Sequence, residues 1–289
     1  MPRAVTTDKV SLFYKDWGPR DGSPIVLLHG WPLTGDTFDD LAVALADDGY
    51  RSIVPDRRGF GRSDQPWDGY DYDTFARDVD AVLADAGITG PFAVAGFSMG
   101  GGEVSRLVAR HGDRITKAIL IGSIVPYMLK TDDNPNGVPL SVFDGITTSI
   151  KEDRAAFFTG FAKDFYGVGM LAHPVSDAVL HDFFRQAMMA GLRPTLAAAR
   201  AFATTDFRSD LSKFTMPTLV IHGTRDATVP IDATAREVKK AVPNAQLIEY
   251  DGSAHGLFAS DKQRLTNDIR AFLGAAVDTR SAIPLGEPA

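Results

Sequence analysis

Short apolar runs rich in β-branched residues alternate with longer stretches of helical periodicity along most of the chain. The strand-like runs are 25–28, 51–54, 92–95, 118–121, 218–221 and 246–250, and the helical stretches include 37–48, 73–86, 103–111 and 233–241. Apolar strands separated by helices are typical of a mostly parallel, doubly wound sheet that helices cover on both faces. Segment 10–17 instead alternates apolar and polar positions, which predicts an antiparallel edge strand or a hairpin.

The alternation stops between about residues 126 and 214, where the sequence has helical patterns at 147–161, 177–190 and 193–204 but no strand candidate. We therefore expect an α/β core formed by residues 1–125 and 215–274, with residues 126–214 inserted before the last strands as a helical cap. The tail, 275–289, contains two prolines and no periodicity, and we expect it to be flexible.

Composition narrows the class of protein. A hydrophobic content of 44% and a charged content of 23% are ordinary for a globular chain. The net charge of −7 argues against a nucleic-acid partner, because no basic surplus is available to neutralise phosphates. The absence of cysteine excludes disulfides, thiolate catalysis and cysteine zinc sites. No secretory signal and no run of 18 apolar residues is present, so we expect no membrane partner and a cytoplasmic location.

The pentapeptide Gly96-Phe97-Ser98-Met99-Gly100 lies between the strand-like run 92–95 and a helical stretch. G-x-S-x-G in this context is typical of a nucleophile elbow, a turn so tight that small residues must flank the serine. The alternative is a glycine-rich turn that contains a serine by chance. The pentapeptide alone does not separate the two interpretations, so the partners of Ser98 decide between them.

A serine nucleophile needs a base and a carboxylate that orients this base, and both follow downstream. Asp226 comes after the strand-like run 218–221, and His255 comes after the run 246–250. Functional groups of open α/β sheets gather at the carboxyl ends of the strands, so these three residues are expected at one edge. The order Ser, Asp, His is that of α/β-hydrolases. The alternatives are a helix-capping aspartate and a surface histidine.

Acyl transfer also needs hydrogen-bond donors for the oxyanion of the tetrahedral intermediate. The backbone N–H of Met99 is one candidate, because it lies at the start of a helix, where the dipole helps. The backbone N–H of Trp31, in the loop after the first parallel strand, is the other. A plain β-turn with a buried tryptophan is the alternative interpretation for Trp31.

No cofactor and no metal site is expected from the sequence. The run 59–64 lacks the third glycine of a dinucleotide fingerprint, and Gly100-Gly101-Gly102 lacks the lysine of a phosphate loop. Close packing of a helix on a strand explains the three glycines better. His111 suits a helix C-terminus, His222 is interpreted as structural, and His173 and His181 have no carboxylate spaced for metal binding.

Several stretches resemble a known family. They are His29-Gly30-Trp31-Pro32, the run 56–67 with its Arg57-Arg58-Gly59-Phe60-Gly61-Arg62-Ser63 segment, the run 96–103, Asp206-Phe207-Arg208, the run 222–226 and His255-Gly256. Together they resemble the α/β-hydrolase family of cofactor-free (non-haem) haloperoxidases, perhydrolases and bacterial arylesterases. The resemblance covers about residues 10–273, and the tail departs from the usual end of the family.

The resemblance implies an α/β-hydrolase fold, a Ser98–His255–Asp226 triad, and Trp31 and Met99 as oxyanion donors. It further implies a helical cap over a small acyl pocket. The expected substrate-binding residues are Pro32, Phe97, Ile124, Phe161, Phe165, Phe202 and Val229. Ordinary core packing is the alternative interpretation for these side chains.

The expected function is hydrolysis of small carboxylic esters through an acyl-enzyme, with peracid formation when hydrogen peroxide replaces water. Perhydrolase-type members of the family resemble this chain in having proline at position 32. Two alternatives stay open: hydrolysis of small cyclic amides, and a hydrolase-like binding protein with slow turnover. Serine at position 98 disfavours an aspartate-nucleophile dehalogenase or epoxide hydrolase. The expected partner is a small acyl substrate, and the sequence leaves a homo-oligomer open.

Overall fold

The computed structural model describes residues 2–274, and a single mixed sheet organises them. Its strands are β1 (Arg3–Val5), β2 (Ser11–Trp17), β3 (Ser23–Leu28), β4 (Tyr50–Pro55), β5 (Phe92–Phe97), β6 (Ile115–Ile121), β7 (Thr218–Gly223) and β8 (Ala245–Tyr250). They are ordered β1-β2-β4-β3-β5-β6-β7-β8. The pairs β1–β2 and β2–β4 are antiparallel and the remaining pairs are parallel, so the predicted fold class is confirmed.

The expected antiparallel segment 10–17 is β2, which pairs with β4 on one side and with β1 on the other. It is therefore the inner strand of a hairpin, and β1 forms the edge of the sheet. The pattern of β2 is mixed rather than strictly alternating, because Leu12, Phe13 and Tyr14 are all buried. Both faces of this strand are buried because helices from opposite sides of the sheet contact it.

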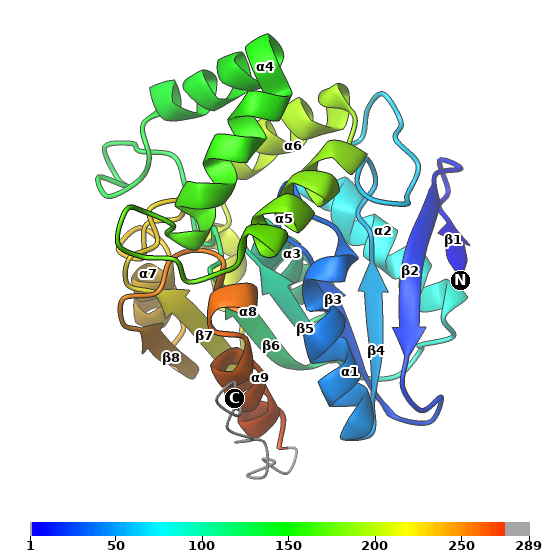
Figure 1. Ribbon diagram of the computed structural model, residues 1–289. Helices are drawn as coiled ribbons and strands as arrows, with labels where there is room; N and C mark the ends of the chain where they lie inside the picture. Colours follow the sequence, from blue (N-terminus) through cyan, green and yellow to red (C-terminus); the bar gives the residue numbers. More distant parts are fainter. Residues whose placement is uncertain (1, 275–289) are drawn as a thin grey trace, which may run out of the picture.

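Helices cover both faces of the sheet, as Figure 1 shows. The helical elements of the core are η1 (Gly35–Phe38), α1 (Asp39–Asp47), α2 (Tyr72–Asp85), α3 (Gly100–His111), η2 (Arg208–Lys213), α7 (Ala235–Ala241), α8 (Leu257–Ser260) and α9 (Lys262–Leu273). Helices α1 and α9 pack together on one face, and α2 and α3 pack together on the other. The short helix α8 and then α9 follow the last strand, β8.

Between β6 and β7 the chain forms α4 (Leu140–Tyr166), α5 (Asp177–Met189) and α6 (Leu192–Thr204). In Figure 1 these helices lie together at the top, above one end of the sheet. Helix α4 is longer than the predicted stretch 147–161 and breaks at Asp153, whose φ and ψ angles of −151° and 90° are not helical. The arrangement is that expected of a cap. Its boundaries at residues 126 and 214 stay a prediction, and the tail 275–289 lies outside the described residues.

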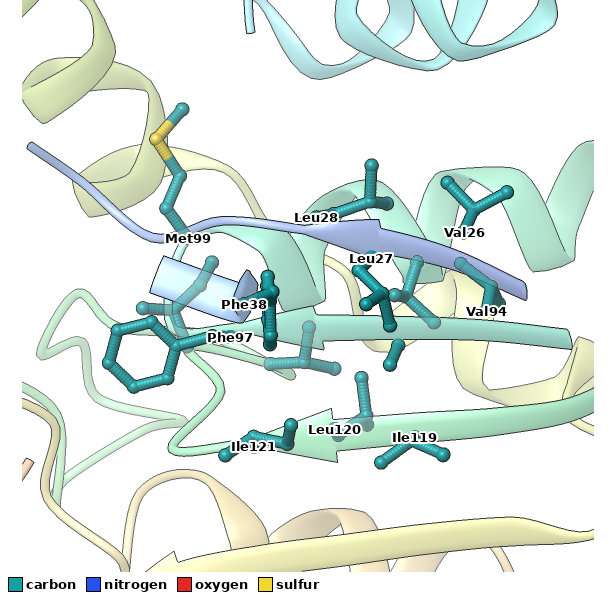
Figure 2. Close-up of a cluster of buried hydrophobic side chains, with 14 of the residues drawn as sticks. Val26, Leu27, Leu28, Phe38, Val94, Phe97, Met99, Ile119, Leu120 and Ile121 are labelled. Atoms are coloured by element: carbon teal, nitrogen blue, oxygen red, sulfur yellow. The ribbon is translucent and has the colours of Figure 1, made fainter. Parts of the chain in front are cut away.

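The core is centred on the middle strands, whose apolar side chains stack across the sheet (Figure 2). Helix α3 approaches this sheet closely because its first turn has no side chains. A Cβ atom on Gly100 would lie 2.1 Å from the carbonyl oxygen of Leu28 in β3, and one on Gly102 would lie 2.4 Å from the Tyr72 ring in α2. The glycine run therefore serves close packing, and it holds the start of α3 at the end of the central strands.

Candidate active site

Ser98 lies in the sharp turn between β5 and α3. Its φ angle of 52° is in the left-handed region, which a residue with a side chain rarely adopts unless the surrounding structure imposes it. A Cβ atom on Gly96 would lie 2.3 Å from the carbonyl oxygen of Gly100, so position 96 admits only glycine. The turn has the geometry expected of a nucleophile elbow, with the serine hydroxyl at the start of a helix.

Two loops that follow neighbouring strands bring a histidine and an aspartate to Ser98. His255, in the loop after β8, has its Nε2 atom 2.9 Å from Ser98 Oγ. Its Nδ1 atom lies 2.6 Å from Oδ2 of Asp226, which is in the loop after β7. Both distances are within hydrogen-bond range, and all three side chains are buried. A hydroxyl, an imidazole and a carboxylate in this line can move the serine proton to the imidazole and stabilise the resulting imidazolium.

Asp226 is buried, yet several donors stabilise its ionised form. Its Oδ1 atom accepts hydrogen bonds from the backbone N–H groups of Thr228 and Val229, at 2.9 and 2.7 Å. Burial by itself would raise the pKa of Asp226, but the charge of His255 and the hydrogen bonds from His222 and His255 hold this pKa well below its usual value. The carboxylate therefore stays ionised at neutral pH.

His222, which the sequence analysis interpreted as structural, is in fact a neighbour of this carboxylate. Its Nε2 atom lies 2.9 Å from the Val229 carbonyl oxygen and 3.3 Å from Asp226 Oδ2. A carbonyl oxygen can only accept, so Nε2 carries the hydrogen and shares it with Asp226. The signal in the sequence is slight: His222 comes four residues before Asp226, at the end of the preceding predicted strand.

Two backbone N–H groups close to the nucleophile have no hydrogen-bond partner among the described residues. A Cβ atom on Gly30 would lie 3.0 Å from Ser98 Cβ, which places the following residue, Trp31, beside the serine. The backbone N–H groups of Trp31 and Met99 donate no hydrogen bond within residues 2–274. Met99 also immediately precedes α3, where the helix dipole favours negative charge. Both groups are thus available to an oxyanion, and their role as its donors stays a prediction.

The loop that carries Trp31, residues 29–35, is fixed from the core side by buried polar groups that the sequence analysis missed. Nε2 of His29 accepts a hydrogen bond from the backbone N–H of Arg57 at 2.9 Å. Arg57 Nη2 in turn donates to the carbonyl oxygen of His29 at 2.6 Å and to the carboxylate of Glu103 in α3. Burial raises the pKa of Glu103 even though this arginine opposes the shift. The pair joins the 29–35 loop to the helix that follows Ser98.

A cavity of about 1090 Å³ opens on Ser98. Its wall includes Trp31 and four of the predicted substrate-binding residues, Ile124, Phe161, Phe202 and Val229. It also includes apolar side chains that the sequence analysis did not single out, namely Met128, Val138, Val142, Phe143 and Ile146. The cavity is therefore much larger than an acetyl group requires.

The other three expected substrate-binding residues lie behind the cavity wall. The rings of Phe97 and Phe165 pack against the His255 ring, with centroids 4.9 and 4.8 Å away. They support the imidazole from two sides because the end of β5 and the end of α4 meet there. Pro32 is buried and follows Trp31 through a cis peptide bond.

Comparison with known proteins places this site in a family. Residues 23–262 match the family described as the alpha/beta hydrolase fold. The chain belongs to the α/β-hydrolase family. A non-heme chloroperoxidase of Kitasatospora aureofaciens is 44% identical to this hydrolase over 276 residues, which cover 94% of the hydrolase and 99% of that relative.

Two further relatives agree with this placement of the hydrolase. A bifunctional esterase/perhydrolase of Acinetobacter calcoaceticus is 40% identical over 275 residues, or 94% of this chain and 99% of the relative. The crystal structure of a bromoperoxidase from Bacillus anthracis has a TM-score of 0.90 and 38% identity, with 94% and 99% of the two chains covered. The predicted family, fold class and enzyme class are confirmed.

Among residues 2–274 this hydrolase has neither a metal-binding cluster of side chains nor a membrane-spanning helix. No group of three or more histidine, aspartate or glutamate side chains lies close enough together to hold a metal ion. No helix in the same range is both long and apolar enough to cross a membrane. Of the histidines outside the site, His111 lies at the end of α3 and contacts Asp80 at 2.7 Å, and His173 lines the cavity.

Proposed function

We propose that the protein is a serine hydrolase that cleaves small carboxylic esters through an acyl-enzyme on Ser98. The observation that carries the proposal is the line from Ser98 Oγ through His255 to Asp226, with hydrogen-bond distances of 2.9 and 2.6 Å. Beside it are the backbone N–H groups of Trp31 and Met99, which have no partner within residues 2–274. A nucleophile, its base, the group that orients this base and the oxyanion donors are the parts that acyl transfer requires.

In the proposed reaction, Ser98 Oγ attacks the ester carbonyl while His255 Nε2 takes the hydroxyl proton. The N–H groups of Trp31 and Met99 stabilise the negative oxygen, and Asp226 stabilises the imidazolium. His255 then gives the proton to the leaving alkoxide, so the C–O bond breaks and the alcohol departs. Water attacks the acyl-enzyme in the second half, with His255 again as base, and releases the acid and free Ser98.

The surroundings of His255 suggest how the ester lies in the cavity. The leaving alcohol receives its proton from His255 and must lie on that side, where Ser253 and Ala254 line the cavity. The acyl group then lies on the opposite side, against Trp31 and Phe202. The ring centroids of these two residues are 5.6 Å apart, and the Phe143 ring lies next to Phe202, with a centroid distance of 6.1 Å. This side is apolar, which suits an alkyl or aryl acyl group.

The same acyl-enzyme accounts for peracid formation, the activity suggested by the relatives' names. Hydrogen peroxide attacks the acyl carbon in place of water, the bond to Ser98 Oγ breaks, and a peroxy acid leaves. The peroxy acid then oxidises halide without a metal. A cytoplasmic location stays a prediction from the N-terminal sequence.

Ser98→Ala tests the proposal. Loss of the nucleophile is expected to lower kcat for p-nitrophenyl acetate by about 10⁴–10⁶-fold while the fold is kept. Retention of more than about a tenth of wild-type activity would contradict the assignment. Stoichiometric labelling of Ser98 without turnover would favour the slow binding protein instead.

Pro32→Leu tests the peracid branch. Proline removes one N–H next to Trp31, and it restricts the conformation of the preceding residue, which influences where the Trp31 carbonyl points. A carbonyl aimed at the attacking molecule can accept the second O–H of peroxide. We expect the ratio of perhydrolysis to hydrolysis of an acetyl ester to fall in the variant. An unchanged ratio would contradict the role of Pro32. If the wild type forms no detectable peracid, the proposed perhydrolase activity is refuted.

A further inference from the structure

The cap holds the 29–35 loop through two sets of hydrogen bonds. The indole N–H of Trp31 donates to the carbonyl oxygen of Thr195 in α6 at 3.0 Å. The backbone N–H and the hydroxyl of Thr34 both donate to Oε1 of Gln186 in α5, at 3.1 and 3.0 Å. The cap therefore touches, on its own side, the same loop that presents the Trp31 backbone N–H to Ser98.

Gln186 is oriented for this contact and is shielded from water. Only 4% of the residue is exposed, and Thr34 is fully buried. The Nε2 atom of Gln186 donates to Asp182, one turn earlier in α5, at 2.7 Å. This bond fixes which end of the amide carries the oxygen, and it aims Oε1 at Thr34. Two donors of one loop residue thus converge on a single buried acceptor.

A displacement of Thr34 would reach Trp31, because the loop is short and closed. The backbone N–H of Leu33 donates to the carbonyl oxygen of Gly30 at 3.1 Å, which makes residues 30–33 a turn that moves as one body. The backbone N–H of Gly35 is bound to Asp56 Oδ1 at 2.8 Å, and this fixes the far end of the loop in the core. Gln186 binds Thr34, which lies between this fixed end and the 30–33 turn.

We propose that Gln186 is a positioning residue: it fixes the 29–35 loop from the cap so that the Trp31 N–H lies where the oxyanion forms. The inference rests on the proposed function, because it assigns a role within the same reaction. Without the Gln186 oxygen, two buried donors of Thr34 lose their acceptor, and the loop shifts to satisfy them. A shift of less than 1 Å at an oxyanion donor is enough to slow the chemical step.

The cap offers a matched control at Gln65. Its Nε2 atom donates to the carbonyl oxygen of Met189 at 2.9 Å, and its Oε1 atom accepts from the backbone N–H of Gly191 at 2.7 Å. Gln65 thus joins the cap to the core by as many bonds as Gln186 does to Thr34, but it does not contact the 29–35 loop and its own loop carries no triad residue and no oxyanion donor. Gln186→Leu and Gln65→Leu each remove two hydrogen bonds between cap and core. They differ in the loop released and in burial, because Gln65 is exposed and Gln186 is buried, so the comparison rests on kcat and not on stability.

We expect Gln186→Leu to lower kcat for p-nitrophenyl acetate by about 10- to 100-fold with KM changed less than about threefold. Gln65→Leu should leave kcat within about threefold of wild type. Phenylboronic acid, which forms a tetrahedral adduct on a serine nucleophile, should bind Gln186→Leu more weakly by the factor lost in kcat/KM. Equal losses in the two variants, or an unchanged kcat in Gln186→Leu, would overturn the inference.

If Gln186→Leu does not fold, Thr34→Val and Thr34→Ser give the same information. Valine has a similar size but removes the hydroxyl, which donates to Gln186 and also accepts from the backbone N–H of Asp36. Serine keeps both bonds, so kcat should fall in the first variant and stay near wild type in the second. Equal kcat values in these two variants would overturn the inference. A wild type without Ser98-dependent hydrolysis would refute the proposed function, whereas an active wild type with no special effect at Gln186 would refute the positioning role alone.

Discussion

Asp226 Oδ2 faces two imidazole rings, those of His255 at 2.6 Å and His222 at 3.3 Å. Only the His255 ring reaches Ser98, whereas His222 is bound to the carbonyl oxygen of Val229 in the aspartate's own loop. The carboxylate is thus fixed by donors on both of its oxygens before it contacts the base. A side chain held in this way can select the tautomer of His255.

Asp226→Asn separates this role from simple charge loss. The backbone N–H groups of Thr228 and Val229 require an acceptor, so the amide oxygen takes the Oδ1 position and the NH₂ group faces His255 Nδ1. His255 must then carry its proton on Nε2, where it cannot accept the Ser98 proton. We expect normal folding with kcat lowered by about 10⁴-fold, measured with p-nitrophenyl acetate. Full activity would mean that another carboxylate orients His255.

Individual site residues can be predicted from the sequence where a motif or the end of a predicted strand marks them. Ser98, Asp226 and His255 could be placed at one edge because each follows a recognisable strand. Phe97 and Phe165 could not be separated from cavity residues, since an aromatic side chain against an imidazole and one in a pocket wall have the same local pattern. The roles of the placed residues stay predictions until they are tested.

Among the elements, α3 determines the site most directly, because its first turn contacts β3 without any intervening side chain. The Cβ atom of alanine at position 100 would meet a backbone oxygen, which cannot move as a flexible side chain can. By contrast, Gly160 in α4 is exposed and has no atom within 4 Å of an added Cβ. The two glycines are both helical, and only one is required by packing.

We therefore expect Gly100→Ala to lower the free energy of unfolding by about 1–3 kcal/mol and to reduce activity, as the start of α3 moves away from β3. Gly160→Ala should instead raise the free energy of unfolding by about 0.4–1 kcal/mol. Urea denaturation and esterase assays check both variants. A Gly100→Ala protein as stable and active as wild type would show that the contact between α3 and β3 can relax.

Helix and strand patterns predicted the central elements, but they missed a very short strand and underestimated the length of one long helix. Strand β1 has three residues, too few for an alternation to be visible. Helix α4 exceeds the predicted stretch because its solvent-facing and partly buried residues blur the period on both sides of the break at Asp153. For α9 the signal was present in the spacing of Leu265, Ile269 and Leu273, all of which are buried.

Across the whole molecule, ion pairs connect elements that are distant in sequence. Arg58, almost fully buried, binds Asp78 of α2 at 2.6 Å and Asp8 of the β1–β2 hairpin at 2.8 Å. The hydrogen bonds from Arg58 and Thr6 lower the pKa of Asp8 to about 2. Burial raises the pKa of Asp78 in spite of the same arginine, so Asp78 acts in the opposite sense on the pH dependence of stability.

A folded pKa below the unfolded value of about 3.9 means that Asp8 stabilises the protein above about pH 4 and loses this contribution as the pH falls towards 2. We expect Asp8→Asn to be less stable than wild type at pH 7, and the difference to shrink between about pH 4 and 2. Urea midpoints at several pH values measure it. Asp21→Asn is the control, because Asp21 is exposed and makes no ion pair among residues 2–274. A constant difference for Asp8→Asn would contradict the linkage.

For the molecule as a whole, the sequence did not predict the contacts between residues that are distant along the chain. The position of β4 between β2 and β3 and the bond from Gln186 to Thr34, 152 residues apart, depend on which surfaces meet after folding. Neither has a local pattern. Conversely, the mostly parallel order of the sheet and the site at its carboxyl edge follow from alternating strands and helices alone.

The close contact between Gly100 and β3 separates a part of the sequence that tolerates substitution from a part that does not. The glycines of residues 96–102 are confined, Gly96 and Gly100 by backbone and Gly101 and Gly102 by side chains, so a substitution at any of them disturbs the nucleophile before it alters a substrate contact. Much of the cavity wall, including Met128, Val142 and Phe143, comes from side chains of the insertion between β6 and β7, which is not part of the elbow. A population selected for a new ester should therefore accumulate its substitutions in that insertion and keep residues 96–102 unchanged, so that one chemical mechanism can serve many substrates through successive generations.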